Sequence, residues 1–314
     1  MALYRPRVRI LSVAQFREHY ATPEQCAVHL ARVRWPDGFV CPHCCGSRSC
    51  YIKDRRVHQC TTCRRQTSLA AGTIFHGSRV PLDKWFWAIY RLAQDKKGCS
   101  AMLLSKELDV SYPTAWLMGH KIRQAMNRGN QPLALQGLIE LDDAYLGGVR
   151  EDQKGRPSGE DQRLTPILVA VEVLPDGRPG RAALRPVRNF RKPWVNEFVW
   201  NCLTPHCVVK TDHMKGFTDL PRFGHTHQTI PLGMDKKQAC KMLPKVHLLI
   251  SNLKRFILGR HHATRGKHAQ RYLGEFNFRF NRRNEESTLF ATLIQACVRA
   301  QVITYPQLCK AERT

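Results

Sequence analysis

Acidic residues in two separate stretches have the type and context of a metal-dependent catalytic site. Asp142 and Asp143 follow the run Leu138–Leu141 in GLIELDDAYLGG, which is apolar except for Glu140, and Asp212 ends the apolar run CVVKTD. If the two runs are paired strands, Asp142 and Asp212 lie side by side, where their charges repel unless cations separate them. Carboxylates are the ligands that Mg²⁺ prefers. The sequence therefore predicts a site for Mg²⁺ or Mn²⁺.

Such a site is suited to phosphodiester chemistry. Two ions held about 3.5–4 Å apart activate the attacking oxygen and stabilise the leaving oxygen. A purely structural interpretation also fits these residues: Asp142 and Asp143 would cap a turn, and Asp212 would cap a helix that begins in HMKGF.

The segment PKVHLLISNLKRFILGRHH offers a third contribution to this site. Folded as one helix at about 100° per residue, it places His247 and Lys254 on one stripe, with Asn252 well away from Lys254. His247 or Asn252 can supply a neutral metal ligand, whereas Lys254 can only contact phosphate. The alternative is a basic surface helix that packs through its leucines and isoleucines. The residues leave the choice between His247 and Asn252 open.

A second metal site is indicated near the N-terminus. Two C-x2-C pairs, separated by fifteen residues, can supply four thiolates to one tetrahedral zinc in a zinc ribbon: Cys41, Cys44, Cys60 and Cys63. Other nearby side chains could replace a ligand, namely His43, Cys45, Cys50 and His58. The stretch RVHQCTTCRRQTSL alternates as a strand of the ribbon would. We expect a structural zinc ion here.

Helices are expected between the ribbon and the aspartates. VPLDKWFWAIYRLAQDKK predicts a helix with a buried apolar side formed by Trp85, Phe86, Ile89, Tyr90 and Leu92. The next stretch, CSAMLLSKELDVSYPTAWLMGHKIRQAMNRG, predicts two short helices joined by a turn at 109–111. This pattern is typical of a helix-turn-helix, whose second helix enters the major groove.

The second of these helices divides into two sets of side chains. We expect Trp116, Met118, Ile122 and Met126 to point inward, which leaves His120, Lys121, Arg123 and Arg128 for another surface. Lys121 and Arg123 are therefore predicted to contact DNA.

Charge indicates the partner. Lys and Arg number 50 against 25 Asp and Glu, which gives a net charge of +25, so double-stranded DNA is the expected partner. No uncharged apolar window of about 18 residues and no signal peptide are present, so we expect a cytoplasmic protein without a membrane partner. Thirteen cysteines, an odd number, favour reduced thiols over a disulfide framework.

The predicted organisation has four parts: an N-terminal segment with the zinc ribbon at 1–75, the helix-turn-helix region at 76–130, a catalytic domain at 131–290 and a C-terminal helix or tail at 291–314. The turn-rich NRGNQPLALQG marks the main boundary. Beyond it, strands are expected first and then alternate with helices, which predicts an α/β domain with a mixed sheet flanked by helices. GGVREDQKGRPSGEDQR is expected to be a mobile loop.

Several motifs together resemble a known family. IELDDAYLGG, KTDHMKGF, ISNLKRFILGRHH and KHAQRYLGEFNFRFNRR, with the ribbon cysteines, resemble DDE-type transposases of bacterial insertion sequences, specifically the family numbered 1595. The resemblance covers roughly residues 30 to 290. It implies an RNase H-like fold and an enzyme that binds transposon ends, cuts DNA and joins it to a target. It also implies at least a dimer on DNA.

The resemblance also implies roles for individual residues. Asp142 and Asp212 match the first two catalytic carboxylates, but the helix around Lys254 has no Glu or Asp at the third position. Part of the family has Asn there, which matches Asn252. If the register is instead fixed on Lys254, the glutamate of other branches falls on His247. The family favours Asn252, and helical geometry favours His247.

The last motif carries two further expectations. Glu275 and Arg279 are predicted to form a supporting i, i+4 pair. Arg282 and Arg283 are predicted to meet DNA phosphate.

Two functions from different classes therefore remain. The first is a transposase that uses a freed 3'-hydroxyl to attack target DNA by in-line phosphoryl transfer. The second is a DNA-binding regulator or decayed transposase without catalysis, which the missing third carboxylate favours.

Overall fold

The computed structural model describes residues 11–96, 98–129, 134–147, 164–230, 242–261 and 266–310. Contacts divide the chain into two compact units. The N-terminal unit runs to Gly129 and includes Asn284–Leu308, and the second unit is Asn130–Arg283 together with Cys309–Thr314. The division falls in the predicted turn-rich boundary. The segment predicted as a C-terminal helix or tail at 291–314 belongs to the N-terminal unit as far as Leu308.

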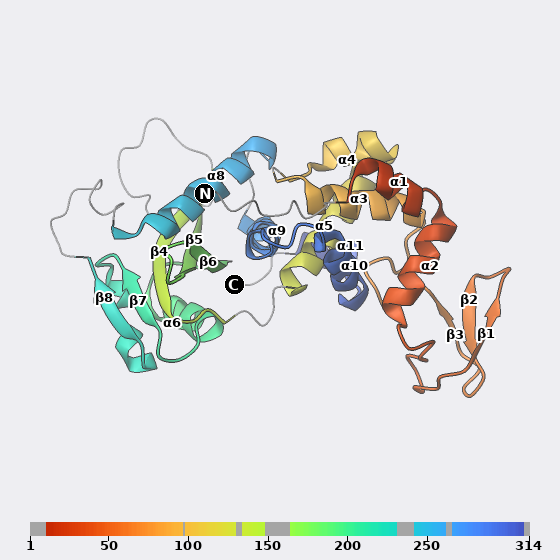
Figure 1. Cartoon of the computed structure of the whole chain (residues 1–314), viewed down its shortest axis with the longest axis horizontal. Helices are drawn as coiled ribbons and strands as arrows, with labels where there is room; N and C mark the ends of the chain where they lie inside the picture. Colours follow the sequence, from red (N-terminus) through yellow and green to blue (C-terminus); the bar gives the residue numbers. More distant parts are fainter. Residues whose placement is uncertain are drawn as a thin grey trace, which may run out of the picture. The chain divides into compact units, whose positions relative to one another are not determined.

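The N-terminal unit is mainly helical (Figure 1). Its helices are α1 (Val13–Tyr20), α2 (Pro23–Arg34), α3 (Leu82–Gln94), α4 (Ala101–Leu108), α5 (Tyr112–Gly129), α10 (Leu289–Arg299) and α11 (Tyr305–Cys309). Capping boxes at Ser12 and Thr22 start α1 and α2. The five predicted core residues of α3 are all buried. Phe16 packs against Tyr90 and Phe290, so α1, α3 and α10 share one aromatic core.

The segment predicted as a zinc ribbon is a three-stranded antiparallel sheet in the order β1-β2-β3. Its strands are β1 (Ser49–Ile52), β2 (Val57–Cys60) and β3 (Gln66–Ser68). The stretch predicted as one strand contains both β2 and β3. A tight turn separates them because Arg64 adopts a left-handed φ of 60°.

The predicted turn between α4 and α5 is confirmed, with Asp109 in the left-handed region at φ 49°. The prediction that His120, Lys121 and Arg123 form an exposed face of α5 is wrong, whereas Arg128 is exposed as predicted. Lys121 is 6% exposed and its Nζ donates to the carbonyl of Ile74, and Arg123 is 2% exposed and donates to the carbonyl of Cys99. α5 is an 18-residue helix packed against α3, α4 and α10, so Lys121 and Arg123 bond carbonyl groups inside the unit.

The second unit is a mixed α/β domain, as predicted. Its sheet has the order β6-β5-β4-β7-β8 and contains β4 (Leu138–Leu146), β5 (Thr165–Val173), β6 (Pro179–Pro186), β7 (Val208–Thr211) and β8 (Thr226–Thr229). β4, β5 and β6 pair antiparallel, whereas β4–β7 and β7–β8 are parallel. β4 does not end at Asp142 but continues beside β5 to Leu146.

Helices cover both faces of this sheet (Figure 1). Ile139 and Leu141 of β4 share a buried cluster with α6 (Lys192–Cys202), and Ala144 and Leu146 share one with α8 (Pro244–His261) and α9 (Ala269–Asn281). Alternate residues of β4 therefore face opposite layers. Short 3₁₀ helices complete the unit: η1 (Lys215–Phe217), η2 (Leu220–Phe223) and η3 (Gly266–His268). Most of the predicted mobile loop, 148–163, lies outside the described residues.

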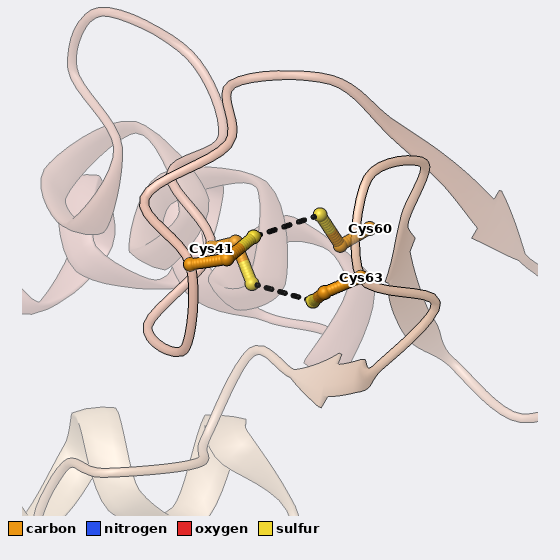
Figure 2. A group of neighbouring side chains, drawn as sticks. Cys41, Cys60 and Cys63 are labelled. Carbon is orange, nitrogen blue, oxygen red and sulfur yellow. Dashed lines mark hydrogen bonds between the residues drawn. The ribbon is translucent and has the colours of Figure 1, made fainter.

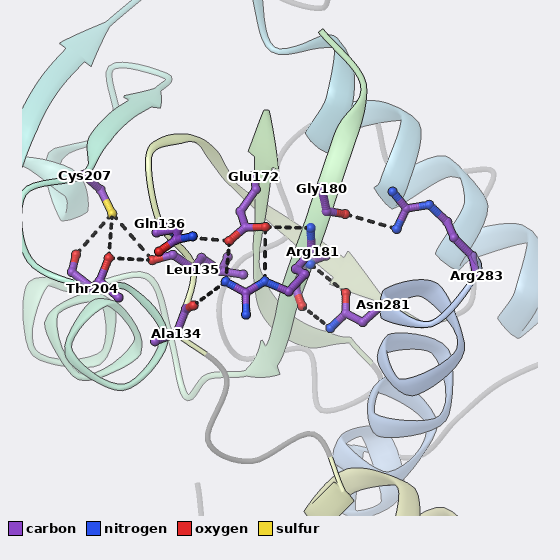
Figure 3. Close-up of polar contacts among 11 residues, drawn as sticks. Ala134, Leu135, Gln136, Glu172, Gly180, Arg181, Thr204, Cys207, Asn281 and Arg283 are labelled. Carbon is purple, nitrogen blue, oxygen red and sulfur yellow. Dashed lines mark hydrogen bonds and ion pairs between the residues drawn. The ribbon is translucent and has the colours of Figure 1, made fainter. Parts of the chain in front are cut away.

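The end of α9 closes the free edge of β6 (Figure 3). The Asn281 side chain accepts the N–H of Ala182 at 2.7 Å and donates to its carbonyl at 3.0 Å, as a neighbouring strand would. Arg283 donates to the carbonyls of Gly180 and Pro179. Strand edges with unpaired backbone groups invite pairing with other chains. Asn281 and Arg283 therefore protect this edge.

The neighbouring charged residues of α9 are also engaged. Glu275 and Arg279 form the predicted i, i+4 pair at 3.5 Å. The guanidinium of Arg282 lies 4.0 Å from the ring centroid of Phe278 and donates to that residue's carbonyl. The predicted phosphate contacts of Arg282 and Arg283 stay a prediction, and the structure gives both side chains contacts within the domain.

The chain has no helix, among the residues that the structure describes, that is both long and apolar enough to cross a membrane.

We predict that Asn281→Ala lowers the free energy of unfolding by about 1–3 kcal/mol, because two hydrogen bonds to the sheet edge are lost. Denaturant unfolding measures the change. The exposed Asn284 offers a matched control, and Asn284→Ala should stay within about 0.5 kcal/mol of the wild type. Equal effects of the two substitutions would contradict the edge-closing role.

Candidate metal centres and active site

Strand pairing brings the predicted aspartates together. β4 pairs in parallel with β7, with Glu140 opposite Lys210, and Asp142 and Asp212 each lie two residues further along. Carboxylate oxygens of Asp142, Asp143 and Asp212 lie within 4.8 Å of one another. The predicted juxtaposition of Asp142 and Asp212 is confirmed. Asp143 joins them, although the sequence suggested only a turn-capping role for it.

Local hydrogen bonds also hold these carboxylates. Asp142 Oδ1 accepts the N–H of Asp143 at 2.9 Å, and Asp212 Oδ1 accepts the N–H of Met214 at 3.1 Å. Asp142 and Asp143 lie within β4 and cap no turn, and Asp212 bonds the residue that precedes the short helix η1. An ionised carboxylate has about four acceptor positions, so it can accept such hydrogen bonds and bind a metal ion at the same time.

The donor set fits a hard divalent cation. Three clustered carboxylates repel one another unless positive charge lies among them. Their oxygens are the ligand type that Mg²⁺ and Mn²⁺ take. β4 is the central strand of the sheet, so the backbone of Asp142 is held rigidly, and the Asp142 side chain is largely buried.

α8 presents His247 to this group. His247 Nδ1 lies 3.7 Å from Asp142 Oδ2. Burial lowers the pKa of His247; Asp212 acts in the opposite direction, and Lys254 lowers the pKa further. A neutral imidazole has a free nitrogen lone pair and is a common metal ligand. His247 therefore lies beside the carboxylates, and its burial favours the neutral form of the imidazole.

Asn252 is directed elsewhere. Its Oδ1 accepts a hydrogen bond from the guanidinium of Arg255 at 2.9 Å. Five residues of helix rotate it by about 140° from His247 around α8. Lys254 is exposed and close enough to His247 to affect its pKa. The structure thus brings His247 and Lys254 to one side of α8, as the helical geometry predicted.

The four ribbon cysteines form the second centre (Figure 2). Their sulfur atoms lie within 4.8 Å of one another, and the Cys41–Cys63 and Cys44–Cys60 pairs are each separated by 3.6 Å. Zn–S bonds of about 2.3 Å in a tetrahedron place sulfurs about 3.8 Å apart. The spacing fits one zinc ion.

The two cysteine turns have the same backbone geometry. The carbonyl of Cys41 accepts the N–H of Cys45, and the carbonyl of Cys60 accepts the N–H of Arg64. Cys45 and Arg64 both have left-handed φ values, 59° and 60°. The two C-x2-C segments therefore form equivalent turns, and each contributes two cysteines to the metal site.

These turns also favour thiolates. The backbone N–H groups of Cys63 and Thr62 lower the pKa of Cys60 to about 6. For Cys44, the N–H of Gly46 lowers the pKa, but the neighbouring sulfurs outweigh it and raise the value to about 12. Four thiolates repel one another unless a cation balances them. Zinc supplies that charge.

The alternative ligands lie outside the cluster. His43 Nδ1 is 2.9 Å from Arg65, and His58 Nδ1 is 3.1 Å from the hydroxyl of Ser49. The backbone at Gly46 lies against the cysteine cluster, because a Cβ at this position would lie 3.3 Å from Cys60 Sγ. The predicted set of four cysteines is the one that the fold brings together.

The chain therefore combines a four-cysteine zinc ribbon with a mixed α/β domain whose clustered carboxylates can bind a divalent cation. Family models identify both parts: residues 21–66 match the transposase zinc-ribbon domain, and residues 134–281 match the ISXO2-like transposase domain. A relative from Halobacterium salinarum, described as an uncharacterized protein in transposable element ISH50, is 31% identical over 212 residues. That match covers 64% of this chain and 71% of the relative.

This chain belongs to the ISXO2-like transposases of the insertion-sequence family numbered 1595. Among solved structures, a pre-cleavage Mos1 transpososome matches with 10% identity and a TM-score of 0.26, over 68% of this chain and 77% of that chain. A score this low supports no conclusion about shared structure.

We predict that Cys60→Ser removes zinc from the ribbon, because the remaining thiolates no longer complete a tetrahedral site. Elemental analysis should find about one zinc per chain in the wild type and much less in the variant. Cys45→Ser is the matched control, since Cys45 is exposed and outside the cluster. Loss of zinc from Cys45→Ser, or its retention in Cys60→Ser, would contradict the assignment.

Proposed function

We propose that the protein is an active transposase that binds the terminal repeats of an insertion sequence and catalyses metal-dependent DNA strand cleavage and transfer. The observation that carries the proposal is the group of carboxylates formed by Asp142, Asp143 and Asp212. This group lies within the part of the chain that matches the ISXO2-like transposase domain. A metal site at the centre of that domain is the expected place for its chemistry.

The fold we propose for this domain is RNase H-like. The family resemblance implies it, and the sheet is consistent with it: an antiparallel meander of β4, β5 and β6 precedes two strands that are parallel to β4. In this arrangement the first and fourth strands, β4 and β7, are neighbours; Asp142 lies on β4 and Asp212 directly follows β7.

Named residues then take separate roles. Asp142 and Asp212 would hold Mg²⁺ or Mn²⁺, with Asp143 adding negative charge and His247 a neutral ligand. When bound, two such ions activate the attacking oxygen and stabilise the leaving oxygen. Lys254, which is exposed beside His247, would attract a DNA phosphate. Asp143 would also offset the missing carboxylate on α8.

DNA binding is proposed for the N-terminal unit. The zinc ribbon carries exposed basic side chains in the turns that flank its strands, namely Arg48, Lys53, Arg55, Arg56, Arg64 and Arg65. Such charges bind phosphate without reading sequence. A role for α4 and α5 as a helix-turn-helix would use the exposed start of α5 near Tyr112, since Lys121 and Arg123 are buried. Two transposon ends must meet, so we propose a homo-oligomer on DNA.

The alternative is a DNA-binding protein without catalysis. The absence of a carboxylate on α8 favours it, since the His247 imidazole adds no negative charge to the site. Asp143 weakens that argument, because it brings a third carboxylate from β4.

We predict that Asp142→Asn and Asp212→Asn each reduce strand cleavage by about 10³-fold, the equivalent of about 4 kcal/mol in the barrier. The measurement is cleavage and joining of labelled DNA that carries the element's own ends, with Mg²⁺ or Mn²⁺. Asp176→Asn, in an exposed turn, is the control and should cleave as the wild type does. Tight binding without cleavage by the wild type would favour the non-catalytic alternative.

We also predict that His247→Ala reduces cleavage by about 10²-fold, whereas Asn252→Ala changes it less than about threefold. The reason is that His247 lies against Asp142 and the Asn252 amide bonds Arg255. The same assay measures both, and the metal concentration for half-maximal rate should rise only for His247→Ala. The reverse order would assign the third ligand to Asn252.

A further inference from the structure

Glu140 lies on β4, two residues before Asp142, and therefore on the same face of the sheet. It is 4% exposed. Its Oε2 accepts the backbone N–H groups of Lys245 at 2.7 Å and Val246 at 2.9 Å. Both donors belong to the first turn of α8, whose N–H groups have no partner within the helix.

Glu140 replaces a missing helix cap. Such N–H groups are usually bonded by a Ser, Thr, Asp or Asn side chain just before the helix. Here that residue is Leu243, which has no acceptor in its side chain and is 1% exposed in the core. The carbonyl of Leu243 accepts the N–H of His247, as expected at the start of a helix. The acceptor that the helix lacks comes from the neighbouring strand.

The turn that Glu140 holds is the turn that carries His247. From one strand, Glu140 bonds the backbone of Lys245 and Val246, and Asp142 lies 3.7 Å from the ring of His247. We propose that Glu140 is a positioning residue for the metal site, which sets the axial position of α8 and so the place of His247 beside Asp142. The proposal rests on the proposed function of that site.

Apolar packing alone does not set this position. Val246, Leu249 and Leu253 bury one side of α8 against the sheet, but burial of apolar surface is not directional. A slip by one residue moves a helical side chain by about 1.5 Å along the axis and 100° around it. Two hydrogen bonds to one carboxylate oxygen oppose such a slip. A buried carboxylate is costly unless it is bonded in this way.

Glu172 offers a matched control within the same domain. It is also a buried carboxylate, 6% exposed, and it accepts the backbone N–H groups of Gln136 and Arg181 at 3.0 and 2.9 Å (Figure 3). The guanidinium of Arg181 pairs with it at 2.8 Å. Substitutions of Glu172 therefore disturb a similar buried group that bonds β6 and the segment before β4 instead of α8.

The test separates the position of the carboxylate from its charge. Glu140→Gln keeps the length of the side chain and an acceptor oxygen, and Glu140→Asp keeps the charge but shortens the side chain. Mn²⁺ affinity is measured by calorimetry without DNA, and hydrogen exchange is measured at the amides of Lys245 and Val246. Zinc content and far-UV circular dichroism establish that each variant is folded.

We expect Glu140→Asp to weaken Mn²⁺ binding about tenfold and to speed exchange at both amides, as loss of an outer-shell contact does. Glu140→Gln should stay within about threefold of the wild type. Glu172→Asp should leave Mn²⁺ affinity within about twofold. Combining Glu140→Asp with His247→Ala should add little to the effect of His247→Ala alone, because Glu140 acts through His247.

Several outcomes would overturn the proposal. One is wild-type Mn²⁺ affinity in Glu140→Asp despite faster exchange at Lys245 and Val246. Another is a larger loss in Glu140→Gln than in Glu140→Asp, which would show that charge matters and position does not. An equal loss in Glu172→Asp would indicate general destabilisation. A wild-type protein whose Mn²⁺ binding does not depend on Asp142 and Asp212 would instead overturn the proposed function itself.

Discussion

The parallel pairing of β4 with β7 is the constraint on which the second unit depends. It aligns the two strands so that Asp142 and Asp212 meet, although a long stretch of chain separates them. The same pairing makes β4 the central strand, with helices on both faces. Carboxylates held this close on rigid strands repel one another. The fold therefore holds these carboxylates close together, and a bound divalent cation would offset the repulsion between them.

The strand β4 also organises α8. Along one face it presents Glu140 to the helix backbone and Asp142 to the side chain of His247. The next apolar positions on that face, Ala144 and Leu146, continue into the core beneath α8 and α9. The first half of β4 thus carries polar side chains that must lie at hydrogen-bond distance from α8. The second half carries apolar side chains that are buried in the core.

A large positive charge on the chain does not mean that every basic residue meets DNA. Lys121 and Arg123 bond carbonyl groups inside the N-terminal unit, and Arg283 bonds the edge of β6. Buried guanidinium and ammonium groups need acceptors, and loop and edge carbonyls supply them. The zinc ribbon shows the opposite pattern: its small core of Phe39, Cys41 and Cys60 leaves its basic side chains in solvent.

Local patterns in the sequence determined the zinc ligands, the buried face of α3, the strands that bear the aspartates and the supporting Glu275–Arg279 pair. Each depends on residues close together in the chain, or on a periodicity that one element imposes. Tertiary structure alone decided that Asp143 joins the carboxylates, that His247 and not Asn252 faces them, and that Lys121 and Arg123 are buried. Those outcomes depend on which elements pack against β4 and α5, and helical spacing shows only which residues share a face. Glu140 caps α8, and Asn281 bonds the edge of β6. Both contacts join residues far apart in the chain, so no local pattern could have indicated them.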